Sequence, residues 1–473
     1  MGDFQTPSAL VAKVLKVLGP VGELWPRVLE PTCGTGNFIR GLIHLASPPR
    51  EIKAFELQDT HVRRADRVAS RGGSTLVEVR KANLFKIDLR RELKWTGNGP
   101  LLVIGNPPWI TSAEIGSLGG VNLPKKSNLR GLQGFDAVTG ESNFDLAEHI
   151  WIKLLKELAP ERPTIAMLCK MAVARNVLRF AHQKSLPLEQ VSIRKIDAGK
   201  WFHAAVEACL LCVQVGSDAV DIEAQVYSDL DSRHPESVLA VRGGTVTDLT
   251  GYDRTAFMDG VCPVSWRQGL KHDAAAVMEL KESEGRLTNK FGDEVTVESD
   301  YVYPLLKGSD LFKQAQPVPR LFTIVTQRKL REPTERLQTE APLLWAYLDT
   351  NAAFFAKRKS AVFKGQGQFA IFGIGDYSFA NYKVAVAGMY KTPRFRVVRP
   401  FRGRPVMLDD TCYFVPCTSP AHAALIAGLL NHPICQDFIA SVTFRGAKRP
   451  ITKAILQRID LNALAKKLHP EKF

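Results

Sequence analysis

The amino-acid sequence predicts an α/β chain in which a doubly wound, Rossmann-like sheet is followed by a smaller β-rich α+β domain. Strand and helix signals alternate through the first half, a glycine-bearing turn joins the first strand to a helix, and the pattern changes after Ser217. Beyond that residue, Gly-Gly turns and short β-type runs replace the alternation. At 473 residues the chain is too long for one ordinary core. We expect one domain over residues 1–235 and a second over residues 236–473.

The elements follow from the spacing of the apolar residues. Leu10, Val11, Val14, Leu15 and Leu18 recur at helical spacing and predict an amphipathic helix over residues 7–18. Apolar runs bounded by turn residues predict strands at 27–30, 52–56, 76–79, 101–104, 164–168 and 208–215. Further helices are expected from residue 37 and over 144–158. The second domain shows β-type runs at 302–306, 320–325 and 396–398.

The charge balance favours a polyanionic partner. Lys and Arg number 63 against 48 Asp and Glu, a formal charge of +15, and a surplus of this size is more readily understood if the partner is nucleic acid. The N-terminus has no basic start followed by an apolar stretch, and no apolar run approaches the roughly 20 residues of a membrane span. We expect a cytoplasmic protein without a membrane partner.

Eight cysteines are spread along the chain. Cys209 and Cys212 have the spacing of half a zinc site, but they stand inside an apolar run that predicts a buried strand. A second Cys or His pair with ligand spacing does not accompany them. We interpret them as core thiols and expect no metal site.

A cofactor pocket is predicted where the first strand ends. The segment from Leu29 to Phe38 joins the strand to a helix through Gly34 and Gly36, and a turn without Cβ atoms lets a ligand approach the backbone. Glu56 ends the second strand about 20 residues later, where a carboxylate of this architecture reaches ribose hydroxyls. Glu30 would line the same pocket, and two carboxylates favour an adenosine-containing cofactor without phosphates. The alternative is that Glu56 is a solvated charge at a strand end.

The turn Asn106-Pro107-Pro108-Trp109 follows the fourth strand. It offers the Asn side-chain oxygen and a proline-adjacent carbonyl as acceptors, with a flat ring beside them. That combination suits methylation of an exocyclic amino group. The alternative is a rigid Pro-Pro corner with a core tryptophan.

Four segments, in this order, resemble one family. They are residues 2–7 (Gly-Asp-Phe-Gln-Thr-Pro), 29–38, 55–57 (Phe-Glu-Leu) and 106–109. They resemble the gamma class of amino-group DNA methyltransferases, above all the N6-adenine enzymes of restriction-modification systems. The resemblance covers roughly residues 1 to 215 and implies S-adenosylmethionine as the cofactor.

The resemblance also implies roles for cofactor-binding residues. Thr6 and Pro7 would lie over the methionine end, and Glu56 would bind the ribose. Glu30 and the turn would surround the sulfonium and amino-acid part, the turn residues being Cys33, Gly34 and Gly36, with Phe38 in the same segment. Asn83 stands where the family has an Asp for the adenine amino group, and it can accept the same hydrogen bond without a charge.

The catalytic residues would be Asn106, Pro107, Pro108 and Trp109. Asn106 Oδ1 and the Pro107 carbonyl would accept the two amino hydrogens of adenine and turn the nitrogen lone pair toward the sulfonium methyl, so that the methyl transfers directly. The base must leave the duplex to reach the pocket, where Trp109 would stack on it. By resemblance Asp145 helps to hold the active-site loop, and Phe202 lies near the flipped base unless it is a core residue.

The DNA contacts are expected in two regions. Lys125, Lys126 and Arg130 lie in the long polar segment 110–143, which is either a phosphate-contacting lid or a solvated loop. Strand alternation would place Arg394 and Arg396 on one face, against DNA, with Phe395 and Val397 on the other. Basic runs at 357–359 and 444–449 extend this footprint, and segments 304–310 and 369–380 resemble target-recognition regions.

The leading hypothesis is a sequence-specific DNA adenine methyltransferase that acts on double-stranded DNA as a monomer. A cognate restriction endonuclease is a candidate partner. The alternatives are methylation of cytosine N4, of rRNA bases or of a protein amide, and a catalytically silent DNA-binding specificity subunit. The sequence shows no convincing nuclease constellation.

Overall fold

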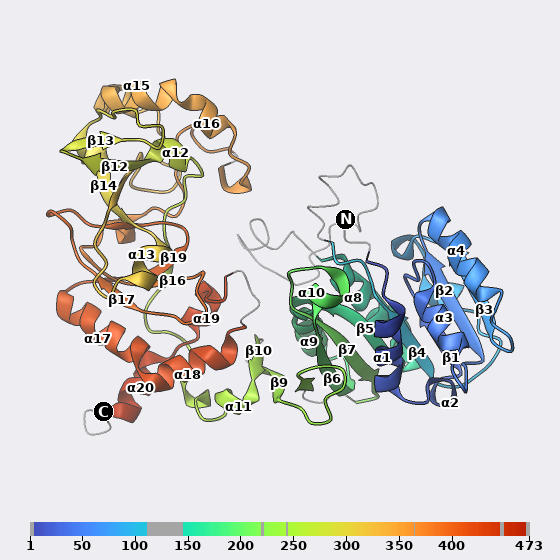
Figure 1. The fold of residues 1–473 in the computed structure, drawn as a ribbon. Coiled ribbons are helices and arrows are strands. Elements are labelled where there is room, and N and C mark those ends of the chain that lie inside the picture. The colour runs from blue at the N-terminus through green and yellow to red at the C-terminus, as the bar shows by residue number, and fades with distance from the viewer. Residues whose placement is uncertain are drawn as a thin grey trace. The chain divides into compact units, whose positions relative to one another are not determined.

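The protein forms two compact units, residues 1–250 and 251–473 (Figure 1). Their structure is a computed structural model that describes residues 4–110, 145–218, 222–242, 245–363, 365–444 and 449–469. Lys125, Lys126, Arg130 and Asn143 lie outside the described residues. So does the segment 445–448.

The first unit is built on one large sheet. In its described part the strands lie in the order β10-β9-β8-β6-β7-β5-β4-β1-β2-β3. β1 to β5 are parallel, and β7 runs antiparallel to both β5 and β6. The strands are β1 (Arg27–Glu30), β2 (Glu51–Glu56), β3 (Leu76–Lys81), β4 (Leu101–Gly105), β5 (Thr164–Lys170), β6 (Leu188–Ile196), β7 (Ala208–Val215), β8 (Glu223–Tyr227), β9 (Ser237–Arg242) and β10 (Thr245–Asp248).

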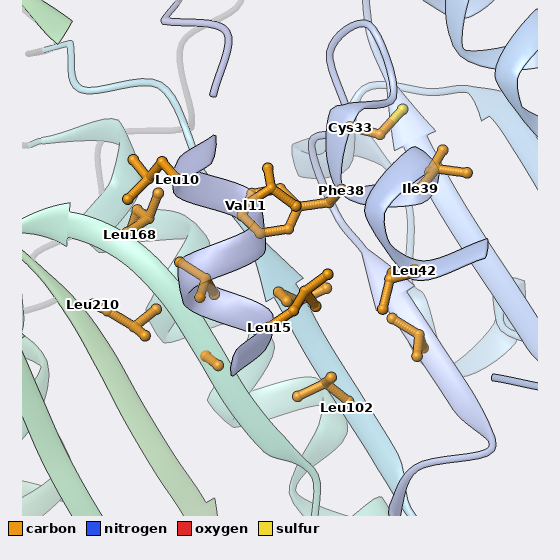
Figure 2. Packing of buried hydrophobic residues seen from close by; sticks show 14 of the residues in the cluster. Leu10, Val11, Leu15, Cys33, Phe38, Ile39, Leu42, Leu102, Leu168 and Leu210 are labelled. Carbon is orange, nitrogen blue, oxygen red and sulfur yellow. The ribbon is translucent and has the colours of Figure 1, made fainter. Parts of the chain in front are cut away.

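Helices cover the sheet because its strands are apolar on both faces. One set packs through α1 and α3, whose residues Leu10, Val11, Phe38 and Ile39 belong to the same buried apolar cluster as Leu102, Leu168 and Leu210 of the strands (Figure 2). Another set contains α8 and α9, and α9 contacts β5 and β7. The helices are α1 (Ser8–Leu18), α2 (Val21–Leu24), α3 (Asn37–Ile43), α4 (Asp59–Ala69), α5 (Leu89–Glu92), α8 (Leu146–Leu158), α9 (Met171–Gln183), α10 (Ala198–Phe202) and α11 (Leu249–Tyr252), the last of which spans the division between the units.

The expected α/β class with a doubly wound sheet is confirmed, and the six expected strands of the first half are present as β1 to β5 and β7. The expected boundary at residue 235 differs from the division after Thr250. The reason is strand pairing: β9 and β10 continue the first unit's sheet through β8, which pairs with β6. The sequence of a short strand flanked by polar residues does not show with which other strand it pairs.

The second unit contains two smaller sheets, ordered β11-β19-β16-β17 and β13-β12-β15-β14-β18 among its described residues. Separate apolar cores lie against each. The strands are β11 (Arg267–Gln268), β12 (Glu279–Ser283), β13 (Arg286–Thr288), β14 (Val302–Leu306), β15 (Leu321–Ile324), β16 (Tyr382–Ala387), β17 (Arg396–Val398), β18 (Met407–Leu408) and β19 (Cys412–Cys417). The helices are α12 (Ala275–Met278), α13 (Gly308–Lys313), α14 (Leu337–Glu340), α15 (Pro342–Thr350), α16 (Ala352–Ala356), α17 (Pro420–Asn431), α18 (Pro433–Val442), α19 (Lys453–Gln457) and α20 (Leu461–Leu468).

No single helix in the described ranges has both the length and the apolar character needed to cross a membrane. The consecutive helices α17 and α18 meet those criteria only when taken together, and they are bent by 60°.

Candidate active site

A cavity of about 250 Å³ lies in the first unit where β1, β2 and β4 end. Carboxyl ends of parallel strands are where α/β sheets bind ligands, because the loops diverge there. Of the expected site residues, the cavity lining includes Thr6, Glu30, Cys33, Gly34, Phe38, Glu56, Asn83, Asn106 and Pro108. Pro7, Gly36, Pro107, Trp109 and Phe202 are not part of this lining.

The turn after β1 requires glycine at two positions. Gly34 and Gly36 have φ angles of 53° and 82°, in the left-handed region that side chains with a Cβ rarely adopt. A Cβ on Gly34 would also lie 2.6 Å from Gln5 Oε1. Gln5 Oε1 in turn accepts hydrogen bonds from the Thr35 main-chain N–H (2.9 Å) and hydroxyl (2.8 Å). The segment at residues 4–6 therefore closes over the turn.

Glu30 and Glu56 place two carboxyl groups in the cavity. Glu30 is 2% exposed, and its Oε2 has no hydrogen-bond partner among the described residues. Burial and then the nearby Glu56 raise the pKa of Glu30 well above 4.5. Glu56 accepts from the main-chain N–H groups of Gly34 (2.9 Å), Leu57 and Gln58 (both 2.8 Å). These bonds hold its carboxylate at the strand end, with acceptor capacity remaining for hydroxyl groups.

Asn106 follows β4, and its amide is oriented by the N-terminal segment. Nδ2 donates to the Phe4 carbonyl (3.2 Å). Oδ1 is buried and has no donor among the described residues. A buried acceptor left without a donor is costly, so such an atom is a strong indication of a ligand contact. The arrangement suits recognition of an amino group.

The rings of Phe4, Trp109 and Phe202 form a cluster beside Asn106. Trp109 contacts Phe202 edge-on, with ring centroids 5.0 Å apart, and Phe4 at 5.8 Å. Trp109 and Phe202 are each 5% exposed. Phe202, expected near the flipped base unless it is a core residue, lies in the buried apolar core against Trp109. Trp109, the expected stacking partner of the base, is itself buried among neighbouring rings.

Lys170 is a site residue that the sequence reasoning missed. At the end of β5, its Nζ donates to the Trp109 carbonyl (3.0 Å) and to Asp145 Oδ2 (2.8 Å). Asp145 Oδ1 caps α8 by accepting from the Ala147 N–H (3.0 Å), and the Leu146 N–H donates to the Ile110 carbonyl (2.9 Å). These bonds tie the turn at 106–110 to α8. Its position could have indicated a role in the site, because it lies two residues beyond the expected end of the strand at 168, where the other site residues also follow strands.

Other expected residues have different surroundings. Asn83 lines the cavity, but its Oδ1 accepts from the Phe85 N–H (3.0 Å) and so caps a short helical turn. In the second unit, Arg394 donates to the Phe312 carbonyl (2.9 Å) and Arg396 to the Leu311 carbonyl (3.2 Å). Both guanidinium groups thus bond to main-chain carbonyls at the end of α13, although the Arg394 side chain remains exposed and precedes β17. Arg358 and Arg449 of the basic runs are likewise bonded to main-chain carbonyls.

Comparisons with known proteins identify the family of the chain. No family model matches the sequence. Type II methyltransferase M.NspV of Nostoc sp. is 32% identical over 471 residues, which are 98% of this chain and 97% of that protein. The Type IIL restriction-modification enzyme MmeI, solved in complex with DNA, is similar with a TM-score of 0.56 at 13% identity, over 94% of this chain and 62% of the MmeI chain. The MmeI similarity concerns the fold alone, whereas the similarity to M.NspV extends over nearly the whole of both sequences. The chain therefore belongs to the Type II DNA methyltransferases of restriction-modification systems.

Proposed function

We propose that the protein transfers a methyl group from S-adenosylmethionine to N6 of adenine within a specific sequence of double-stranded DNA. The observation that carries the proposal is the Asn106 amide. Its nitrogen donates to the Phe4 carbonyl, while its buried oxygen has no donor among the described residues. An exocyclic amino group supplies that donor. A cognate restriction endonuclease and a monomeric state remain predictions.

The cavity fits S-adenosylmethionine in charge and position. Glu30 Oε2, buried and without a partner among the described residues, is suited to accept a hydrogen bond from the cofactor's ammonium group. Glu56 is suited to accept hydrogen bonds from the ribose hydroxyl groups. Two carboxylates in one cavity disfavour a phosphate-bearing cofactor. When bound, S-adenosylmethionine supplies an electrophilic methyl group on a sulfonium.

The protein's part in the reaction is positioning. Asn106 Oδ1 and the Pro107 carbonyl accept the two N6 hydrogens, which draws the nitrogen toward a tetrahedral geometry with its lone pair available. The acceptors are preorganised, because the Phe4 carbonyl already fixes the Asn106 amide. Methyl transfer to N6 would then be direct, with a thioether as the leaving group, one N6 proton released to solvent and no covalent enzyme intermediate.

The adenine reaches the cavity by leaving the duplex. Trp109 and Phe202 are its proposed stacking partners. Because Phe4 contacts both rings, the entering base displaces Phe4 from part of that contact. Lys125 and Arg130 remain the proposed phosphate contacts of the loop.

The proposal is tested by incubating unmodified genomic DNA with the protein and methyl-labelled S-adenosylmethionine, then identifying the labelled nucleoside and its sequence context. We expect N6-methyladenine at one recurring sequence. Label on cytosine N4, or label accepted only by RNA or protein, would replace the adenine assignment. Binding of DNA without any cofactor binding would indicate a silent specificity subunit.

Cofactor affinity is expected to weaken on acidification through Glu30. Its raised pKa means that lowering the pH protonates the carboxyl group in the free protein, and a neutral carboxyl attracts the cofactor's ammonium less. The loss is about tenfold or more, since hydrogen bonds to charged groups contribute about 1.5–3 kcal/mol. Calorimetric titration across the acidic to neutral range should show this dependence in the wild type. The Glu30→Gln variant should bind S-adenosylmethionine more weakly than the wild type, and its affinity should not depend on pH in this range.

Methylthioadenosine, which lacks the amino-acid part, is the control ligand for this experiment. Its affinity should not follow the Glu30 titration. A wild-type S-adenosylmethionine affinity that is flat over the same range, or equal in Glu30→Gln, would contradict the assigned contact.

Lys170→Met is expected to lower kcat about tenfold through misplacement of the catalytic turn. Cofactor affinity should stay near the wild-type value, because Lys170 is not part of the cavity lining. Asp145→Asn should have a similar effect, and the double variant should be little worse than either single variant, since both remove one shared contact. Single-turnover methylation measures the effect.

The matched control is Lys153→Met, which removes a lysine bonded to Glu157 on the same helix α8. Its kcat should be close to that of the wild type. Additive losses in the Lys170 and Asp145 double variant would argue against a common role.

A further inference from the structure

Arginines stacked on aromatic rings recur in the second unit, and most of their guanidinium groups are also bonded within the protein. Arg402 pairs with Glu282, and Arg404 donates to the Ser299 and Val302 carbonyls. Arg336, Arg358 and Arg394 also donate to carboxylate or carbonyl oxygens. Arg267 and Arg328 differ: neither guanidinium makes a hydrogen bond or ion pair with any residue in the described ranges. Both side chains are exposed.

Arg267 and Arg328 lie over two rings of the same short turn, Asp376–Phe379. The Arg267 guanidinium is 4.7 Å from the Tyr377 ring centroid, and that of Arg328 is 4.1 Å from the Phe379 centroid. Phe379 is supported by an edge contact with Tyr303, with centroids 5.5 Å apart. Both guanidinium groups therefore lie against the same short turn.

The platform beneath them is rigid. Lys271 and Phe372 exchange two main-chain hydrogen bonds, each 2.8 Å long. Gly373, at φ 76°, packs so closely that a Cβ there would lie 2.6 Å from the Gly269 carbonyl oxygen. Within the turn, Ser378 is buried and its N–H donates to the Gly375 carbonyl (2.8 Å). The two ring contacts therefore rest on a fixed backbone, which lowers the side-chain entropy that the arginines lose when they bind a partner.

A guanidinium group over a ring keeps its N–H donors available to a partner outside the protein, and its planar fork suits acceptors that lie in pairs. Phosphate oxygens and the O6 and N7 atoms of guanine both qualify. The exposed carboxylate of Asp376 stands in the same turn. It opposes a phosphate group, yet it can accept a hydrogen bond from cytosine N4. Base edges therefore fit this surface better than the backbone does.

We propose that Arg267 and Arg328 read guanine edges in the DNA target. This proposal rests on the proposed function, because it assigns the residues that recognise the substrate of the same enzyme. It places sequence discrimination on the turn Asp376–Phe379 and its two arginines, and not on Arg394 and Arg396, whose guanidinium groups are bonded to α13.

The test uses the full-length protein and duplexes that carry the recognition sequence identified by methylation mapping, together with duplexes in which one base pair is changed. Arg267→Ala and Arg328→Ala should each weaken binding to the intact sequence by about 10- to 100-fold, the range of a bidentate arginine–guanine contact. Each should also lose most of its discrimination at one G·C position. Arg267→Lys and Arg328→Lys should restore little, because an ammonium lacks the planar fork.

Arg402→Ala is the matched control, since Arg402 is exposed and stacked on Phe401 but neutralised by Glu282. It should bind every duplex as the wild type does. Unchanged binding by the Arg267 and Arg328 variants, or equal weakening on all sequences, would overturn the proposal. In that case adenine methylation by the wild type would leave the proposed function standing. A wild type that methylates no DNA would remove both.

Discussion

Asn106→Ala is expected to reduce methyl transfer by about 10²- to 10³-fold, the usual effect of removing one preorganised group from a developing charge. The alanine variant lacks the buried Oδ1, which has no donor within the described ranges. It also frees the Phe4 carbonyl, which otherwise receives the Asn106 Nδ2 hydrogen bond of 3.2 Å. The loss should fall on kcat, because the proposed contact of the amide is with the amino group of the base and not with the cofactor's ribose or methionine end. Single-turnover transfer of labelled methyl groups to duplex DNA measures it.

Asn106→Asp separates the two functions of the amide. Its carboxylate retains an acceptor oxygen but cannot donate to the Phe4 carbonyl, so the orientation of the group is lost and repulsion replaces attraction. We expect a loss comparable to that of alanine. Asn83→Ala is the matched comparison, because Asn83 lines the cofactor side of the same cavity and should weaken cofactor binding with little effect on kcat. Near-normal transfer by both Asn106 variants would eliminate the proposed mechanism.

The residues of the site that the sequence predicts are those that directly follow strands. Glu30, Glu56 and Asn106 end or follow β1, β2 and β4, and parallel strands bring such positions together at one edge of a sheet. Gly34 and Gly36 are predictable for a similar reason, since a tight strand-to-helix turn needs φ angles that few other residues adopt. Such site residues can be predicted from the local sequence, because the order of the parallel strands determines which strand ends lie side by side.

The remaining features depend on packing between distant segments. The bond from Lys170 to the Trp109 carbonyl joins residues 61 positions apart, and nothing in either segment specifies the other. Burial of Trp109 depends in the same way on Phe4 and Phe202. The spacing of Arg394 and Arg396 suggests a shared face, but only the fold shows that both donate to main-chain carbonyls of α13. Sequence periodicity indicates which side chains share a face, and it does not identify the neighbour of that face.

Lys383→Met is expected to abolish a strong pH dependence in the stability of the second unit. Lys383 is 1% exposed in β16, and no described carboxylate pairs with it. Burial lowers its pKa from 10.5 to about 7. Its Nζ donates to the carbonyls of Ala380 (2.6 Å) and Val406 (2.9 Å), which matches the two N–H donors of a neutral amine. Among the described residues, no carbonyl accepts from a third donor, which the ammonium form would carry.

The sign of the effect follows from proton binding. Between pH 7 and pH 10.5 the unfolded chain holds a proton on Lys383 that the folded chain has lost, so stability rises with pH across this window and is lower, but constant, below it. At about 1.4 kcal/mol for each pH unit, the full difference is roughly 5 kcal/mol. The methionine variant lacks this titration, but it leaves two carbonyls without a donor at about 1–3 kcal/mol each.

The two stability curves should therefore cross. At alkaline pH the wild type is more stable than Lys383→Met, because its neutral amine donates to both carbonyls. At acidic pH the cost of burying the lysine cation removes this difference. Denaturant unfolding of both proteins in buffers on either side of the window measures the difference, in which all other titrating groups cancel. Lys359→Met, at an exposed position of the same unit, should run parallel to the wild type. Parallel curves for Lys383→Met would show that this lysine is not neutral inside the folded protein.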